Sequence, residues 1–140
     1  MKVQLKLESG MRLIGVNSSN LETYFDASVK GGGAGSAATP MEILVESMAA
    51  CSMIDVLSIL RKKRKEISDL KIEIDAERAE THPMVFTKVH LKFILTSPDA
   101  EIGDLNRAIE LSQTTYCGAS AMFQRSGCEV TWSSEIIKQD

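Results

Sequence analysis

Residues that commonly anchor a metal ion or a disulfide framework are scarce in this sequence. Its 140 residues include three cysteines, two histidines and one tryptophan, and aromatic residues make up only 5%. No Cys-x-x-Cys or His-x-x-x-His pair occurs, and His82 and His90 fall in a predicted turn and on a predicted strand. Because zinc ligands are normally grouped at short spacing, we expect no metal site and no bound cofactor. The odd number of widely spaced cysteines also argues against a framework of structural disulfides.

Charge and hydropathy argue against two further classes of protein. The formal net charge of -3 argues against a nucleic-acid partner, which a basic chain would favour. No stretch of about 18 apolar residues is free of charged side chains, so we expect no membrane-spanning helix. The first residues alternate as in a strand and lack the hydrophobic segment of a signal peptide. These features favour a cytoplasmic protein, and the length suits a single domain over residues 1–140.

The first part of the chain predicts a small antiparallel sheet followed by a loop. Residues 3–7 alternate between apolar and polar side chains, and a turn at residues 9–10 precedes a second apolar segment, residues 11–16. This pattern predicts a hairpin, to which a short third strand at residues 23–25 can be added. The glycine-rich residues 30–38 lack the Gly-Lys-Ser/Thr ending of a phosphate-binding loop, so we interpret them as a flexible linker.

The clearest local pattern marks the start of a long helix. Thr39 can cap this helix, Pro40 suits its first turn, and Glu42 can reach back to the Thr39 amide, which is the arrangement of a capping box. Helical character continues to about Lys65. Apolar residues lie nearly all round the helix over residues 48–60, so we expect it to be a core helix that is buried on most sides.

The second half of the chain predicts a strand pair, a helical segment and a last strand. Alternating apolar and polar residues at 70–77 and 85–95 predict an antiparallel pair. A helical period follows over residues 99–114, and helical character resumes after Gly118. The apolar residues 130–137 then suit a final strand. The chain therefore predicts an α+β fold without an internal repeat or a convincing domain boundary.

Two of the cysteines lie on separate predicted helices. Cys51 falls within the apolar run of the first helix, and Cys117 lies near the start of the last helical segment. A cysteine in a core helix most often acts as a small hydrophobic residue, and we interpret Cys128, near the last strand, in this structural way. Two thiols on separate buried helices also suit a dithiol redox pair.

The sequence around both thiols resembles the OsmC/Ohr family of thiol-dependent peroxidases. Residues 39–56 read TPMEILVESMAACSMIDV, and residues 107–117 read RAIELSQTTYC. These motifs resemble the OsmC-like, YhfA-type branch more closely than the organic hydroperoxide resistance (Ohr) proteins themselves. The resemblance spans nearly the whole chain in order and spacing, including the N-terminal hairpin, the loop and the strand pair.

The resemblance implies an α+β fold that forms an intertwined homodimer with two long helices at its centre. It also implies that Cys51 attacks an organic hydroperoxide and becomes a sulfenic acid, which Cys117 converts to a disulfide, in defence against oxidative stress. An external thiol reductant, such as a lipoyl-type dithiol, then restores both thiols. We expect an apolar pocket around them, with the candidate lining residues Met41, Met48, Met53, Tyr116 and Met122.

A buried thiol needs help to ionise, because an apolar site raises its pKa above the ordinary value of about 8.5. The family activates its attacking cysteine with an arginine and a glutamate, and the candidates here are Arg12 and Glu42. Met41 stands where the family places the glutamate. On physical grounds alone Cys117 would be the more acidic thiol, because it lies near a helix start. For Asp55 we expect a hydrogen bond or ion pair at the dimer interface.

The departure at the glutamate position leaves a second interpretation open. A non-catalytic OsmC-like dimer could bind a small apolar or electrophilic ligand in the same interfacial pocket. The thiols would then act as sensors or be relics of the catalytic pair. Turnover of organic hydroperoxide separates the two interpretations.

Overall fold

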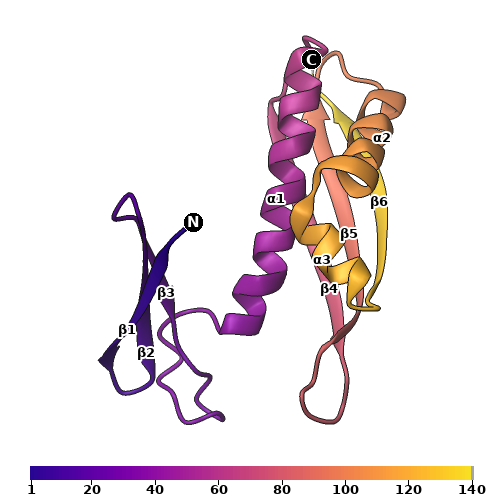
Figure 1. The fold of residues 1–140 in the computed structure, drawn as a ribbon. Helices are drawn as coiled ribbons and strands as arrows, with labels where there is room; N and C mark the ends of the chain where they lie inside the picture. The colour runs from indigo at the N-terminus through magenta and orange to yellow at the C-terminus, as the bar shows by residue number, and fades with distance from the viewer. Residues whose placement is uncertain (140) are drawn as a thin grey trace. The chain divides into compact units, whose positions relative to one another are not determined.

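The computed structural model describes residues 1–139 as a mixed α+β protein, which confirms the predicted fold class (Figure 1). The chain divides into two compact units, Met1–Val45 and Glu46–Asp140, and the single domain over residues 1–140 stays a prediction. The boundary falls inside the long helix α1 (Pro40–Lys62), so each unit is described by itself. Each unit contains one three-stranded sheet.

The N-terminal sheet is an antiparallel meander of β1 (Val3–Ser9), β2 (Arg12–Asn17) and β3 (Glu22–Phe25). This arrangement confirms the predicted hairpin and the third strand. Gly10, at the turn between β1 and β2, has a φ of +58°, a conformation that glycine adopts without steric cost. The apolar side chains of β1 are more than half exposed, so this sheet presents an apolar surface.

The glycine-rich segment after β3 is not a flexible linker, and that prediction was wrong. Its amides bond back to the preceding residues: Gly31 and Gly33 both donate to the Ser28 carbonyl oxygen, and Gly35 donates to that of Ala27. The glycines are needed because the segment folds back on itself closely. A β-carbon on Gly33 would lie 2.1 Å from the Ala27 carbonyl oxygen.

Helix α1 begins as the sequence predicts and ends three residues earlier, at Lys62. Its burial differs from the prediction, because only one face is covered in the described chain. The side chain of Ile54 is 66% exposed. The buried residues repeat at helical spacing along the other face: Met48, Ala49, Ser52, Val56 and Leu60. Burial on most sides is therefore not observed within this one chain, whose described elements cover a single side of the helix.

The C-terminal sheet has the order β4-β5-β6, with β4 (Asp69–Arg78), β5 (Phe86–Ser97) and β6 (Glu129–Lys138). Strands β4 and β5 pair antiparallel as predicted, with Ile72 opposite Phe93. Strand β6 joins the other edge of β5 in parallel, with Trp132 opposite Leu91. The central strand supplies much of the core, since Leu91 and Phe93 are fully buried.

A parallel pair requires a crossover, and here the crossover is helical. It consists of α2 (Ile102–Leu111), a five-residue π-helical turn η1 (Ser112–Tyr116), and α3 (Gly118–Arg125). Both α-helical pieces were predicted from the sequence, but the π turn was not. Helices α2 and α3 contact β6; α2 lies near the C-terminal part of α1, whereas α3 lies lower, near the middle of α1 (Figure 1).

Helix α1 also has the length and composition of a membrane-spanning helix, with a mean hydropathy of 1.9 over an 18-residue window. The sequence interpretation rejected a span because charged residues interrupt the apolar run. Such values also occur in the core helix of a soluble protein, and α1 buries one face within its own chain.

Candidate functional site: two adjacent thiols

The structure brings Cys51 and Cys117 together from two different helices. Cys51 lies near the middle of α1, and Cys117 is the N-cap residue of α3. The Cys117 thiol donates a long hydrogen bond of 3.9 Å to the carbonyl oxygen of Met48, one turn before Cys51. Cys51 is also close enough that its own thiol raises the pKa of Cys117. Both thiols are free, with no disulfide between them.

The two thiols differ in their access to solvent. Cys117 is only 3% exposed, whereas Cys51 is partly exposed in the described chain. A molecule arriving from solvent therefore reaches Cys51 more readily than Cys117. This asymmetry suits a pair in which one thiol reacts with an external substrate and the other reacts with the product of that step.

The environment of Cys117 opposes ionisation overall. Burial raises the pKa of this thiol, and the nearby Cys51 raises it further, whereas the Ser120 hydroxyl and backbone N–H both lower it. The Ser120 N–H lies 3.3 Å from the Cys117 sulfur. The sequence argument that a helix start makes Cys117 acidic is therefore incomplete. The helix start does contribute a donor, but removal from water outweighs it.

The π-helical turn positions the residues just before Cys117. Its closing hydrogen bond runs from the Cys117 amide to the Ser112 carbonyl oxygen, five residues earlier, at 2.8 Å. Isolated π turns are frequent at functional sites. Here the turn buries two polar side chains, Ser112 and Gln113, that face α1.

These polar side chains form a continuous hydrogen-bonded network with α1. Gln113 Nε2 donates to Ser52 Oγ at 2.8 Å, and the Ser52 and Ser112 hydroxyl oxygens lie 2.9 Å apart. Ser112 Oγ donates to Asp55 Oδ2 at 2.9 Å. The bond that the sequence interpretation assigned to Asp55 at a dimer interface is thus made inside the chain.

The carboxylate of Asp55 sets the direction of the whole network, because each hydroxyl has one proton to donate. Ser112 uses its proton on Asp55, so the proton shared with Ser52 must come from Ser52. Ser52 accepts from Gln113 Nε2 and donates its one proton to Ser112, so it has no proton left for Gln113 Oε1. Gln113 Oε1 and Ser120 Oγ are buried without a hydrogen-bond partner among residues 1–139.

The predicted pocket residues differ widely in their placement. Met48 is fully buried, and Met41 and Met53 are partly exposed. Tyr116 and Met122 are 62% and 74% exposed, so burial at an apolar site is not observed for them in the described chain. Tyr116 lines an open groove of about 390 Å³, together with Asp55, Ser58, Ile59, Lys62, Lys63 and Leu111.

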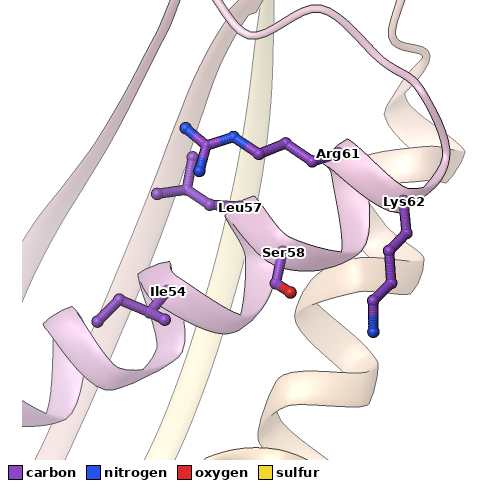
Figure 2. Close-up of a pocket in the computed structure, with 5 residues that line it drawn as sticks. All are labelled: Ile54, Leu57, Ser58, Arg61 and Lys62. Atoms are coloured by element: carbon purple, nitrogen blue, oxygen red, sulfur yellow. The ribbon is translucent and has the colours of Figure 1, made fainter.

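A second groove, of about 480 Å³, follows the exposed face of α1 (Figure 2). Ile54 and Leu57 give it an apolar floor, and Arg61 and Lys62 lie at the C-terminal end of the helix. The Arg61 side chain runs back along the helix toward Leu57 (Figure 2). This surface is apolar with a basic end.

Arg12 is held by partners within the N-terminal unit. Its guanidinium forms an ion pair with Glu8 at 3.1 Å and donates to the Ser36 carbonyl oxygen at 3.1 Å and to the Ser36 hydroxyl at 3.0 Å. It also lies 4.8 Å from the centroid of the Tyr24 ring. The sequence analysis named Arg12 only as a candidate activating residue and did not predict these contacts.

Asp26 holds the same loop in place through its buried carboxylate. It is only 2% exposed, and its carboxylate accepts the Ser36 hydroxyl at 2.6 Å, the Ser36 amide at 3.0 Å and the Ala27 amide at 2.7 Å. The Ser36 hydroxyl, followed by these amides, holds the pKa of Asp26 below its usual range. Ser36 therefore links a buried carboxylate to the Arg12 guanidinium.

Glu42 closes the predicted capping box. Its Oε1 accepts the Thr39 amide at 3.0 Å and the Thr39 hydroxyl at 2.8 Å, while the Glu42 amide donates to the Thr39 hydroxyl oxygen at 3.3 Å. The Thr39 amide, and then the hydroxyl, lower the pKa of Glu42. The capping box is confirmed, whereas a role for Glu42 or Arg12 beside the thiols remains a prediction.

Within residues 1–139, no three histidine, cysteine or acidic side chains are grouped so as to hold a metal ion. Cys128 lies apart from the pair in its contacts, with its thiol 3.8 Å from the Glu129 carbonyl oxygen, and burial raises its pKa.

Sequence reasoning missed Ser52, Ser112, Gln113 and Ser120. The available signal was a set of small polar residues inside apolar helical segments, where unpaired polar groups are costly.

Comparison with known proteins gives a consistent result. The model of the OsmC-like protein family matches residues 32–133. Protein YhfA of Escherichia coli strain K12 is 31% identical over 137 residues, which cover 98% of this chain and 98% of YhfA. Among solved structures, a hypothetical protein from Aquifex aeolicus VF5 is 30% identical, with a TM-score of 0.81 and coverage of 98% of this chain and 97% of that one.

A more distant structure shares the fold. An organic hydroperoxide resistance protein, OsmC, from Legionella pneumophila is 14% identical, with a TM-score of 0.67 and coverage of 98% of both chains. At this identity the likeness concerns the arrangement of helices and strands alone.

Proposed function

This chain belongs to the OsmC-like protein family, and we propose that it is a thiol-dependent peroxidase that reduces organic hydroperoxides through Cys51 and Cys117. The observation that carries the proposal is the pairing of these two thiols, from helices α1 and α3, inside one chain. Hydroperoxide resistance proteins with this fold, such as the one from Legionella pneumophila, support the choice of substrate class.

The proposed cycle begins at the more accessible thiol. The Cys51 thiolate attacks the terminal oxygen of the hydroperoxide, the O–O bond breaks, and the alkoxide leaves as the alcohol by taking up the proton that the Cys51 thiol released when it ionised. Cys51 is then a sulfenic acid. The Cys117 thiolate attacks the Cys51 sulfur, the S–S bond forms, and the hydroxyl group leaves as water after taking up a proton. An external dithiol, of lipoyl type in our proposal, donates two electrons and two protons and restores both thiols.

The order of roles follows from exposure. A hydroperoxide with a bulky organic group reaches the partly exposed Cys51 more readily than Cys117, which is 3% exposed. Cys117 needs no contact with solvent to resolve the sulfenic acid, because its partner is the neighbouring thiol. The sulfenic acid is consumed quickly only when such a thiol is nearby.

The state of assembly and the location of the protein are part of the proposal. We propose an intertwined homodimer, because α1 leaves Leu44 and Ile54 about half or more exposed and β1 exposes its apolar side chains. We also propose a cytoplasmic location, where reducing conditions keep the thiols available. Sedimentation velocity tests the dimer, since a monomer at micromolar concentration would contradict it.

Consumption of cumene hydroperoxide tests the activity. The reduced protein is supplied with dihydrolipoamide, and peroxide loss is followed beside Cys51→Ser, Cys117→Ser and the matched control Cys128→Ser. We expect Cys51→Ser to abolish turnover and Cys128→Ser to preserve it. Equal consumption by the unaltered protein and Cys51→Ser would contradict the proposal.

A second candidate is a non-catalytic dimer that binds a small apolar or electrophilic ligand. Met41 favours it, because it stands where the resemblance to the peroxidases places an activating glutamate, and the neighbouring Glu42 is engaged with Thr39. A bound ligand that covers Cys51, without any consumption of cumene hydroperoxide, would support this candidate over the first.

A further inference from the structure

Ser120 contacts the Cys117 sulfur from the first turn of α3. Cys117 is the N-cap of this helix, and its sulfur accepts the Ser120 N–H at 3.3 Å. A side-chain acceptor for this N–H is usual at a helix start, but the acceptor is normally the oxygen of serine, threonine, aspartate or asparagine. A neutral thiol is a weak acceptor. The bond therefore strengthens when the thiol loses its proton, because hydrogen bonds to charged acceptors are stronger.

The hydroxyl of the same residue is buried without a partner. Ser120 is fully buried, and its Oγ has no hydrogen-bond partner in the part of the chain that the structure describes. Unpaired buried hydroxyl groups are rare and destabilising in folded proteins. The hydroxyl is nevertheless close enough to the Cys117 sulfur that donating to the thiolate lowers the pKa of Cys117. Ionisation of Cys117 thus gives the hydroxyl the partner that it otherwise lacks.

This arrangement acts against the two effects that keep Cys117 protonated, which are burial and the nearby Cys51 thiol. Other titratable groups on the neighbouring elements include Glu46 and Asp55 on α1, Tyr116 on the π turn and Arg125 near the end of α3. Asp55 is engaged with Ser112, and Tyr116 is largely exposed. Ser120, by contrast, contacts the Cys117 sulfur itself, through its backbone N–H at the start of the helix.

We propose that Ser120 is a catalytic residue that uses its backbone N–H and its hydroxyl together to hold Cys117 as a thiolate. Its part in turnover rests on the proposed peroxidase function. In the resolving step the thiolate attacks the Cys51 sulfenic acid, the S–S bond forms, and the hydroxyl group leaves as water after protonation. When an external dithiol thiolate later attacks Cys51 of the disulfide, Cys117 is the leaving group and Ser120 receives it as a thiolate.

The test measures the ionisation of Cys117 directly, without peroxide. In a Cys51→Ser, Cys128→Ser background Cys117 is the one remaining thiol, and its titration is followed by the ultraviolet absorbance of the thiolate. We expect Ser120→Ala to raise the pKa of Cys117 by about one unit, in line with the loss of one hydrogen bond to a charged form. The matched control is Ser126→Ala on the same segment, whose hydroxyl donates to the Phe123 carbonyl oxygen at 2.6 Å. We expect no shift for it.

Thermal unfolding supplies the readout that separates this role from a structural one. Because the Ser120 hydroxyl has no partner while Cys117 is protonated, Ser120→Ala should keep or raise the midpoint of unfolding below the pKa of Cys117. A structural serine would instead lose stability when truncated. An unchanged pKa in Ser120→Ala, or equal shifts in Ser120→Ala and Ser126→Ala, would overturn the proposal.

Single-turnover kinetics of the full chain then connect Ser120 to the cycle. After one equivalent of cumene hydroperoxide, we expect Ser120→Ala to close the Cys51–Cys117 disulfide about tenfold more slowly, which is the change in thiolate fraction for one pKa unit. Sulfenic acid on Cys51 should accumulate meanwhile. If the titration shows the shift but no disulfide ever forms, the proposed function fails while the role of Ser120 at the thiol stands. Equal closing rates in the two proteins would overturn its role in turnover.

Discussion

The hydroxyl of Ser52 on α1 lies 2.9 Å from the hydroxyl of Ser112 on the π turn, and both side chains are fully buried. This contact joins the helix that carries Cys51 to the turn that precedes Cys117. The two serines continue to Gln113 on one side and to Asp55 on the other. A polar network in this position fixes how the two helices meet, because each of its members loses a partner if either helix shifts.

Truncation of Ser52 should therefore destabilise the protein. Ser52→Ala removes the acceptor of Gln113 Nε2 and the donor to Ser112, leaving a buried amide N–H unpaired. We expect the free energy of unfolding to fall by about 1–3 kcal/mol, measured by urea denaturation. The matched control is Ser58→Ala, because Ser58 is exposed on the same helix and its change should stay within about 0.5 kcal/mol. Equal effects of the two substitutions would contradict the network.

Gln113→Glu should destabilise the protein in a pH-dependent way. The substitution keeps the shape of the side chain but places a carboxyl group where Gln113 is 8% exposed. Burial raises the pKa of a carboxyl group in the folded state above the unfolded value of about 4.3. Stability relative to the unaltered protein is then lost as the pH rises from the unfolded pKa through the higher folded pKa. The check is urea denaturation at pH 4 and pH 7, and an equal loss at both would contradict burial of this side chain.

Asp26 should make its loop sensitive to acid. Its pKa is lowered, chiefly by the Ser36 hydroxyl, so its contribution is complete above the ordinary pKa of about 3.9 and is lost as the pH falls through its folded value. We expect the protection of the Ala27 and Ser36 amides against exchange, measured relative to the intrinsic exchange rate at the same pH, to fall at low pH. In Asp26→Asn the same amides should exchange faster already at neutral pH. Unchanged protection in that variant would show that the carboxylate does not hold the loop.

Gly33 tests the close folding of the same loop. A β-carbon there would lie 2.1 Å from the Ala27 carbonyl oxygen, so the backbone must move in Gly33→Ala. We expect a loss of about 1–3 kcal/mol by thermal unfolding, the range for overpacked sites. Gly103→Ala is the matched control: outside the neighbouring backbone of its own helix, a β-carbon there would meet no atom within 4 Å, and alanine favours the helix by about 0.5–1 kcal/mol. Similar behaviour of the two variants would contradict the loop geometry.

Local patterns predicted most of the fold, because each rests on contacts between residues close in sequence. The capping box of Thr39 and Glu42 and the pairing of β4 with β5 are of this kind. The parallel position of β6 depends on contacts across the whole crossover, which periodicity does not report. The exposed face of α1 escaped prediction for another reason. Hydrophobicity indicates that a surface needs cover, but it does not say that the same chain provides the cover.

The site was predictable only in part. The candidate thiols, Cys51 and Cys117, came from their sequence context and the resemblance to a family. The polar residues around the thiols were not predicted, because Ser120 and Gln113 look like ordinary polar helix residues until their burial is known. Their importance arises from the lack of partners in a buried place, which is a property of the tertiary structure.

The central claim is that Cys51 and Cys117 act as one redox pair, and mass-spectrometric mapping of thiols tests it most directly. Reduced protein is treated with one equivalent of cumene hydroperoxide, quenched by alkylation and digested, with Cys117→Ser treated in parallel. The account predicts a rapid Cys51–Cys117 disulfide, with sulfenic acid trapped on Cys51 in the variant and Cys128 left reduced. Both thiols remaining reduced in the presence of the hydroperoxide would contradict it.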